Sequence, residues 1–157
     1  MEKARPNGLT ALCILSWIWM AIALLSVFSE INTGRLTEAD IRAQKIVLLE
    51  SQTEETLEFN SWMVNDTIEM LYISSNNFTT MVVINLAAIL LGLAGVLLMF
   101  QLRKLGYHLY IIYSILSVSY WVYYFHGLNM GWFFIGFSAG FAILFVILYG
   151  TQLKKMT

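Results

Sequence analysis

Residues 81–100 read MVVINLAAILLGLAGVLLMF and contain no charged side chain. Three further runs share this apolar character: Leu9–Phe28, Tyr107–Phe125 and Gly131–Tyr149. A helix rises about 1.5 Å per residue, so about 20 residues cross the roughly 30 Å hydrocarbon core of a bilayer. Only helices and closed barrels satisfy their backbone groups in lipid, and these runs do not alternate as barrel strands do. We therefore expect an all-α fold, an integral membrane four-helix bundle.

Composition agrees with this class of protein. The chain has 157 residues, of which 59% are hydrophobic and 12% are charged, and its mean hydropathy is +0.70. Soluble domains are about 25% charged. The first run also resembles a signal peptide, with a basic start and small residues near Ser29, but its length favours a membrane anchor. Only residues 29–80 form a long segment outside the runs, which leaves no room for a separate catalytic domain.

The charges are distributed unevenly along the chain. The two ends and the turn after the second run carry six basic residues and one acidic residue: Lys3, Arg5, Arg103, Lys104, Lys154, Lys155 and Glu2. Residues 29–80 carry three basic and nine acidic residues. By the positive-inside rule, residues 1–8, 101–106 and 150–157 are cytoplasmic. The acidic loop 29–80 and the turn 126–130 then lie outside the cytoplasm.

The acidic loop is expected to be helical. Thr37 can cap a helix, because its hydroxyl can accept a hydrogen bond from the backbone amide three residues on. Farther along, apolar residues recur at helical steps until the breaker at residues 74–77. The most prominent of them are Leu57, Trp62, Val64, Ile68 and Leu71. Packing of two helices on each other, a partner-binding surface and a ligand pocket are the three interpretations.

Two glycosylation sequons start at Asn65 and Asn77. One such match is expected by chance in a chain with this many asparagines. We regard both as coincidental unless the protein is eukaryotic.

Small residues mark faces where membrane helices can approach closely. In the second run, Asn85, Ala88, Gly92 and Gly95 follow at three- and four-residue steps and share one face. The fourth run has Gly136 and Gly140 at a spacing of four. We expect both faces to be helix contacts, either within one chain or between copies.

The third run is the least apolar one. Tyr110, Ser114, Ser117 and Tyr124 form a polar seam along one face, with Trp121 between the last two. A buried hydroxyl needs a hydrogen-bonding partner. We therefore place this helix inside the bundle, where it bonds to neighbours such as Asn85. A polar path or a small-molecule cavity is the alternative.

Several activities lack support in the sequence. No Asp, Glu, Lys or Arg lies deep in a run, which argues against a driven transporter. His108 and His126 stand at opposite ends of the third run and cannot share a metal ion. Cys13 has no second cysteine and is expected to serve as a packing residue. We find no catalytic or cofactor-binding motif, and the few basic residues do not favour nucleic-acid binding.

Two segments resemble a group of small four-span inner-membrane proteins common in Bacteroidota. They are the opening Arg5–Leu15 and the turn Leu102–Tyr110, where a basic pair precedes a glycine and an aromatic residue. The resemblance implies a bacterial inner membrane with the acidic loop in the periplasm. It implies no activity and no functional residues.

The function expected is that of a non-enzymatic accessory or interaction subunit in a membrane assembly. Its partners would be the lipid bilayer and another membrane protein, recognised through Thr37–Ile73. The alternative is a small channel or carrier, formed by several copies around the Tyr- and Ser-rich third run.

Overall fold

The computed structural model describes residues 7–50 and 54–156, and within these ranges helices joined by short connections make up the chain. The helices, in order, are α1 (Asn7–Thr33), α2 (Glu38–Glu50), α3 (Glu54–Asn76), α4 (Phe78–Phe100), α5 (Leu105–Phe125), α6 (Asn129–Gln152) and the short 3-10 helix η1 (Leu153–Lys155). No strand occurs in the described ranges, which confirms the all-α fold class.

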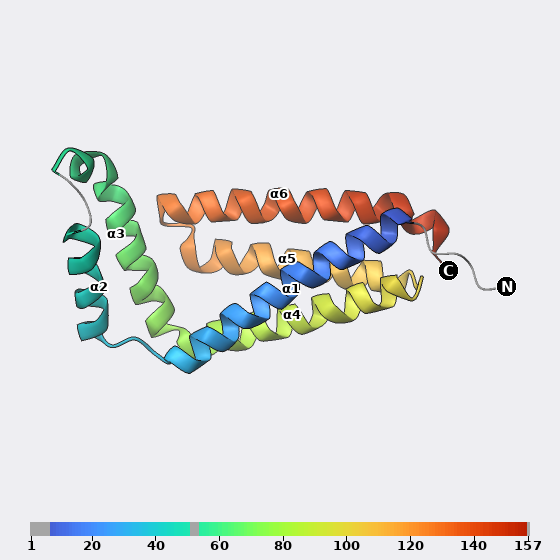
Figure 1. Ribbon diagram of the computed structural model, residues 1–157, viewed down its shortest axis with the longest axis horizontal. Coiled ribbons are helices and arrows are strands. Elements are labelled where there is room, and N and C mark those ends of the chain that lie inside the picture. The colour runs from blue at the N-terminus through green and yellow to red at the C-terminus, as the bar shows by residue number, and fades with distance from the viewer. Residues whose placement is uncertain (1–6, 51–53, 157) are drawn as a thin grey trace.

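Helices α1, α4, α5 and α6 lie side by side (Figure 1), and we call them the four long helices; α3 is of similar length but lies across one of their ends. Helix α5 packs against both α4 and α6, and α1 packs mainly against α4. Helix α1 begins at the same end where α4 meets α5 and where α6 ends; Arg103, Lys104 and Lys154 lie here, so we name it the basic end. Helices α2 and α3 form a hairpin across the opposite end, the acidic end, with α3 nearer to the long helices (Figure 1).

Three of the described helices are long and apolar enough to cross a membrane: α1, α4 and α6. Large apolar side chains such as Leu25, Val83 and Ile143 are exposed on them, as expected for a surface in contact with lipid. These helices support the prediction of a membrane protein with transmembrane helices. Helix α5 has 21 residues but falls outside this group, since its tyrosine and serine residues lower its hydropathy.

Helices α4 and α5 approach each other through glycines. The position where a Cβ of Gly95 would stand is 3.0 Å from the carbonyl oxygen of Gly106. A Cβ on Gly106 would lie 2.5 Å from the backbone nitrogen of Met99, closer than real Cβ atoms come. At Gly92 the same atom would meet Met20 of α1 and Tyr113 of α5. Only residues without a side chain allow the three helices to come this close.

The core of the four long helices is densest toward the basic end. Cys13, Val96, Met99 and Tyr149 are almost completely buried there and come from α1, α4 and α6. The Cys13 thiol is buried, in the packing position expected from the sequence.

The hairpin has its own stabilising contacts. The Asp40 amide donates to the Thr37 hydroxyl at 3.2 Å, which is the cap expected from the sequence. In return, the Asp40 carboxylate accepts from the Thr37 hydroxyl at 2.6 Å and from the Thr37 amide at 2.8 Å. These two bonds favour the ionised carboxylate, the side-chain bond most, and hold the pKa of Asp40 below its ordinary 3.8. Ile41, Val64 and Ile68 form a small buried cluster between α2 and α3.

Polar and apolar contacts fix the hairpin to the long helices. The backbone amide of Met130, in the first turn of α6, donates to the buried Asp66 carboxylate of α3 at 2.9 Å. An aspartate in this place satisfies a free amide and interacts favourably with the helix dipole. Near the end of α3, the Ser75 hydroxyl donates to the Leu36 carbonyl at 2.6 Å.

Apolar residues complete this attachment. Met81, Phe125 and Leu128 form a buried cluster at the acidic end, against which Met70 and Ile73 of α3 pack. The hairpin is therefore held to three of the four long helices: Asp66 of α3 bonds to α6, and the apolar cluster joins α3 to α4 and α5.

Candidate functional site

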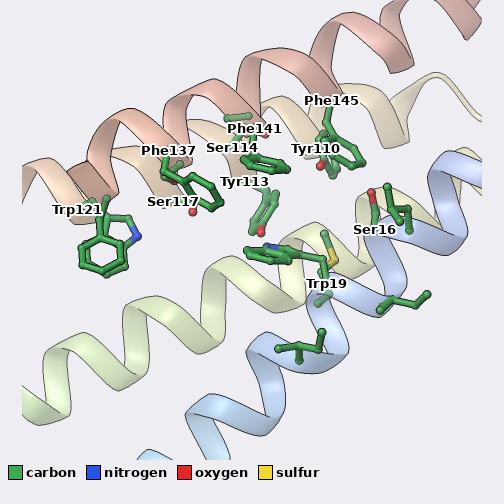
Figure 2. A pocket seen from close by; sticks show the side chains of 17 residues that line it. Ser16, Trp19, Tyr110, Tyr113, Ser114, Ser117, Trp121, Phe137, Phe141 and Phe145 are labelled. Atoms are coloured by element: carbon green, nitrogen blue, oxygen red, sulfur yellow. The ribbon is translucent and has the colours of Figure 1, made fainter. Parts of the chain in front are cut away.

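A crevice of about 510 Å³ lies between α1, α5 and α6. Helix α5 forms its floor, and α1 and α6 form its two walls (Figure 2). None of its lining residues is charged; all are apolar, aromatic or hydroxyl-bearing. Residues of the polar seam line it: Tyr110, Ser114, Ser117 and Trp121.

At the end of the crevice nearer the basic end, the hydroxyl groups bond to one another. The hydroxyls of Ser16 and Tyr149 lie 2.9 Å apart, and both residues are buried. The Ser16 hydroxyl also lies near that of Tyr110. The indole N–H of Trp19 lies near the hydroxyl of Tyr113. At this end of the crevice a hydrogen bond therefore joins α1 and α6, and the rings of Tyr110 and Tyr149, with centroids 5.0 Å apart, join α5 and α6.

Farther along the floor the situation changes at Ser114. Its side chain is 6% exposed, and within the described residues its hydroxyl has no hydrogen-bonding partner. Leaving a buried hydroxyl without a partner costs about 1–3 kcal/mol. Two half-buried serines, Ser117 on α5 and Ser138 on α6, also line the crevice. The crevice thus offers hydrogen-bonding capacity that the described residues do not use.

Aromatic rings form much of the walls. Trp19 of α1 and Phe141 of α6 lie nearly parallel, at an angle of 2°, with ring centroids 6.3 Å apart. Trp121 and Phe134 stack at 5.1 Å at the end nearer the hairpin. Flat apolar faces therefore border the crevice on two sides.

The crevice opens sideways between α1 and α6. These helices touch near the basic end and diverge toward the acidic end (Figure 1). Ile18 and Ile22 on one rim and Phe137 on the other are exposed. A molecule dissolved in the surrounding lipid could enter here without crossing a water-exposed surface.

The other seam residue, Tyr124, lies away from the crevice. It packs against the Met81–Phe125–Leu128 cluster at the acidic end. The residue of α5 nearest to the expected bond with Asn85 is Tyr120, whose hydroxyl lies near the Asn85 side chain. Ala88, Gly92 and Gly95 are buried on the same helix.

The structure corrects the expectation for Gly136 and Gly140 as contacts within the chain. Both are exposed, and a Cβ at either position would have no described atom within 4 Å. The spacing of two glycines defines a face of α6, but it does not say whether another helix covers that face.

The structure also corrects the expected partner surface on α3. Val64 and Ile68 are buried against Ile41 of α2, and Leu71 packs at the edge of that cluster, so these residues serve hairpin packing. Trp62 is exposed, whereas the side chain of Leu57 lies outside the described part of the chain.

A different part of the hairpin presents apolar side chains. Ile46 and Val47 of α2 are 56% and 64% exposed, and Leu49 is exposed beside them. Helix α2 lies on the side of α3 that faces away from the long helices, and it packs mainly against α3 (Figure 1). The four consecutive apolar residues Ile46–Leu49 point to different faces of the helix, so one packing face cannot bury all of them. The sequence alone could therefore have indicated this exposed apolar surface.

Metal-ligating residues are dispersed over the described ranges. No group of three His, Cys, Asp or Glu side chains comes together in them. His108 and His126 each bond to the carbonyl four residues earlier, at Lys104 and Val122, near opposite ends of α5.

Comparisons of the chain with protein-family models, with curated proteins and with solved structures find no match.

Proposed function

We propose that the chain is a four-span membrane protein of the bacterial inner membrane, with both termini in the cytoplasm. Helix α5 is the fourth span in this proposal. The turns that connect it to α4 and α6 are short, and it runs between the same two ends as these candidate spans. Helices α4 and α6 run in the same direction, from the acidic end to the basic end, and α5 runs the opposite way between them. If α4 and α6 both cross the bilayer, α5 must cross it as well.

Within that frame, we propose that the protein is a non-enzymatic accessory subunit of a membrane assembly. The observation that carries this proposal is the exposure of Ile46 and Val47 on α2, in the part of the molecule farthest from the long helices. Contiguous apolar side chains exposed to water mark interaction sites. The Asp66 contact and the apolar cluster beneath α3 hold this surface in a fixed position, which lowers the entropy that binding must overcome.

The charged residues on the hairpin indicate what kind of partner surface would fit it. Glu38, Asp40, Glu50 and Glu69 stand on the hairpin together with Arg42 and Lys45, so its surface is predominantly acidic. A complementary partner would offer an apolar patch surrounded by basic residues. We propose an extramembrane segment of another membrane protein as this partner.

The test is a Val47→Asp variant, purified in mild detergent from the cells that naturally produce the protein. A charge at this position should weaken association by about tenfold or more, because apolar contact area is replaced by a carboxylate without a partner. Gln44→Asp is the matched control, since it adds the same charge at an exposed polar position of the same helix. Particle mass measures the outcome: the wild type and Gln44→Asp should keep a second protein at a fixed ratio, and Val47→Asp should lose it.

Two results would contradict the proposal. One is a full complex recovered after deletion of Thr37–Ile73. The other is a particle that contains only copies of this chain, which would favour the homo-oligomeric channel or carrier.

A further inference from the structure

We infer that the crevice between α1, α5 and α6 binds a neutral, membrane-soluble compound that has a flat ring with an oxygen substituent, as a quinone does. This inference is independent of the accessory-subunit proposal, because none of the crevice residues belongs to the hairpin.

The ligand is neutral because the crevice offers nothing that would compensate a charge. The lining consists of apolar, aromatic and hydroxyl side chains, without Asp, Glu, Lys, Arg or His. A charged group buried at this depth without a counter-ion would lose its hydration and gain no ion pair.

The ligand has a polar atom because Ser114 has an unused hydroxyl. Ser114 is more than nine-tenths buried, lines the crevice and has no bonding partner in the described structure. A carbonyl oxygen of the ligand would accept the hydrogen bond that this hydroxyl can donate. Ser117 and Ser138, on the two helices that flank the same space, offer further bonds.

The depth of Ser114 distinguishes this ligand from a phospholipid. Ser114 is the tenth of the 21 residues of α5, and therefore lies near the middle of the proposed span. Phospholipid headgroups stay at the membrane surface. A ring with an uncharged oxygen can reach the middle of the bilayer, since it carries no charge to dehydrate.

The aromatic walls favour a flat ring. Trp19 and Phe141, from opposite walls, stack on each other with centroids 6.3 Å apart, and Trp121 and Phe134 stack at 5.1 Å, so a ligand ring would pack against the edges and outer faces of these pairs. Aromatic faces pack well against other flat rings, in offset or edge-to-face arrangements. The volume of about 510 Å³ lies within the range of roughly 300–1,000 Å³ that is usual for small-molecule sites.

The lateral opening accommodates the rest of the molecule. From Tyr110 to Trp121 the floor extends about 16 Å along the axis of α5. A hydrocarbon tail attached to the ring can leave between the diverging α1 and α6 and continue into the lipid. Figure 2 shows the rings and hydroxyls that border this space.

The experiment titrates the full-length protein, in nanodiscs of phosphatidylcholine, with decylubiquinone, a benzoquinone that carries a ten-carbon tail. Quenching of tryptophan fluorescence measures binding, because Trp19 and Trp121 line the crevice. Dodecane is the probe for the tail alone. Saturable quenching is expected with decylubiquinone, and dodecane should not displace it.

Three variants locate the site. Ser117→Phe places a large ring in the crevice and should abolish saturable quenching. Ser114→Ala removes one hydroxyl with little change of shape and should weaken binding by about three- to tenfold, the effect of one neutral hydrogen bond. Ser119→Ala should leave binding unchanged, because Ser119 is an exposed serine of α5 outside the crevice.

The inference is overturned if the wild type shows no saturable quenching, or if Ser117→Phe retains it. Wild-type affinity in Ser114→Ala, or displacement of the quinone by dodecane, overturns the assignment of a ring oxygen at Ser114.

Discussion

The contact between α4 and α5 and the hairpin of α2 and α3 are held together by different forces. Gly92, Gly95 and Gly106 bring α4 and its neighbours so close that added Cβ atoms would clash. The hairpin instead encloses a small cluster of Ile41, Val64 and Ile68 and begins at a reciprocal cap between Thr37 and Asp40.

The difference follows from the solvent around each region. In lipid, apolar side chains gain nothing by leaving their surroundings, so helices associate through close backbone packing and a few polar contacts. In water, the burial of three aliphatic side chains is itself favourable. Close backbone packing therefore stabilises the contacts between the long helices, whereas burial of apolar side chains and a helix cap stabilise the hairpin.

The largest expected effect comes from breaking the close packing. In Gly106→Leu, the new side chain would clash with backbone atoms of Gly95 and Met99, which a rotamer change cannot relieve. We expect a loss of about 3 kcal/mol in the free energy of unfolding. Unfolding by a denaturing detergent from mixed micelles measures it.

Gly136→Leu is the matched control for this substitution. A Cβ at Gly136 meets no described atom within 4 Å, so a leucine there should leave the free energy of unfolding nearly unchanged. Equal destabilisation by the two variants would show that the α4–α5 contact is less close than described.

A smaller effect is expected at the junction between the two regions. Asp66→Ala removes the acceptor for the Met130 amide and should destabilise this junction by about 1–2 kcal/mol, as the loss of a helix cap does. Hydrogen exchange should become faster in the first turn of α6 and in the middle of α3, while the α4–α5 contact stays protected. Glu69→Ala, three residues on and exposed, should leave exchange unchanged; if it accelerates exchange as much, the capping role of Asp66 is contradicted.

The smallest effect concerns pH and the start of α2. The Thr37 hydroxyl, and to a lesser degree the Thr37 amide, keep the pKa of Asp40 below 3.8 in the folded state. The stability that comes from the ionised carboxylate is therefore fully present above pH 3.8, and is lost as the pH falls through the lower folded-state pKa. Exchange of the Ile41 amide, which bonds to the Thr37 carbonyl, should accelerate over that acidic range. Asp40→Asn should abolish this pH dependence; if the dependence persists in this variant, another group causes it.

Features that depend on short stretches of sequence could be predicted. The apolar run of residues 81–100 became α4, and the cap at Thr37 and the end of α3 before Asn77 lie where local chemistry puts them. Helices α1 and α6 extend beyond the predicted runs, to Thr33 and Gln152, because a helix does not have to end where its apolar residues do.

Features that depend on which elements meet could not be predicted. The pattern of Gly136 and Gly140 resembles that of Gly92 and Gly95, yet only the second pair meets another helix. Asp66 looked like part of a sequon, whereas in the structure it bonds to a helix start 64 residues away. The seam on α5 was visible in the sequence, but the divergence of α1 from α6 that turns it into the floor of a crevice depends on how whole helices cross.

The central claim is that α5 crosses the membrane as a fourth span, and cysteine labelling in sealed cells tests it most directly. Gln44→Cys lies in the hairpin, Gln101→Cys in the turn between α4 and α5, and Gly127→Cys in the turn between α5 and α6, all exposed. The wild type, whose single Cys13 is buried, provides the background. We predict that an impermeant thiol reagent labels Gln44→Cys and Gly127→Cys in intact cells, and Gln101→Cys only after lysis. Labelling of Gln44→Cys without Gly127→Cys would contradict a transmembrane α5.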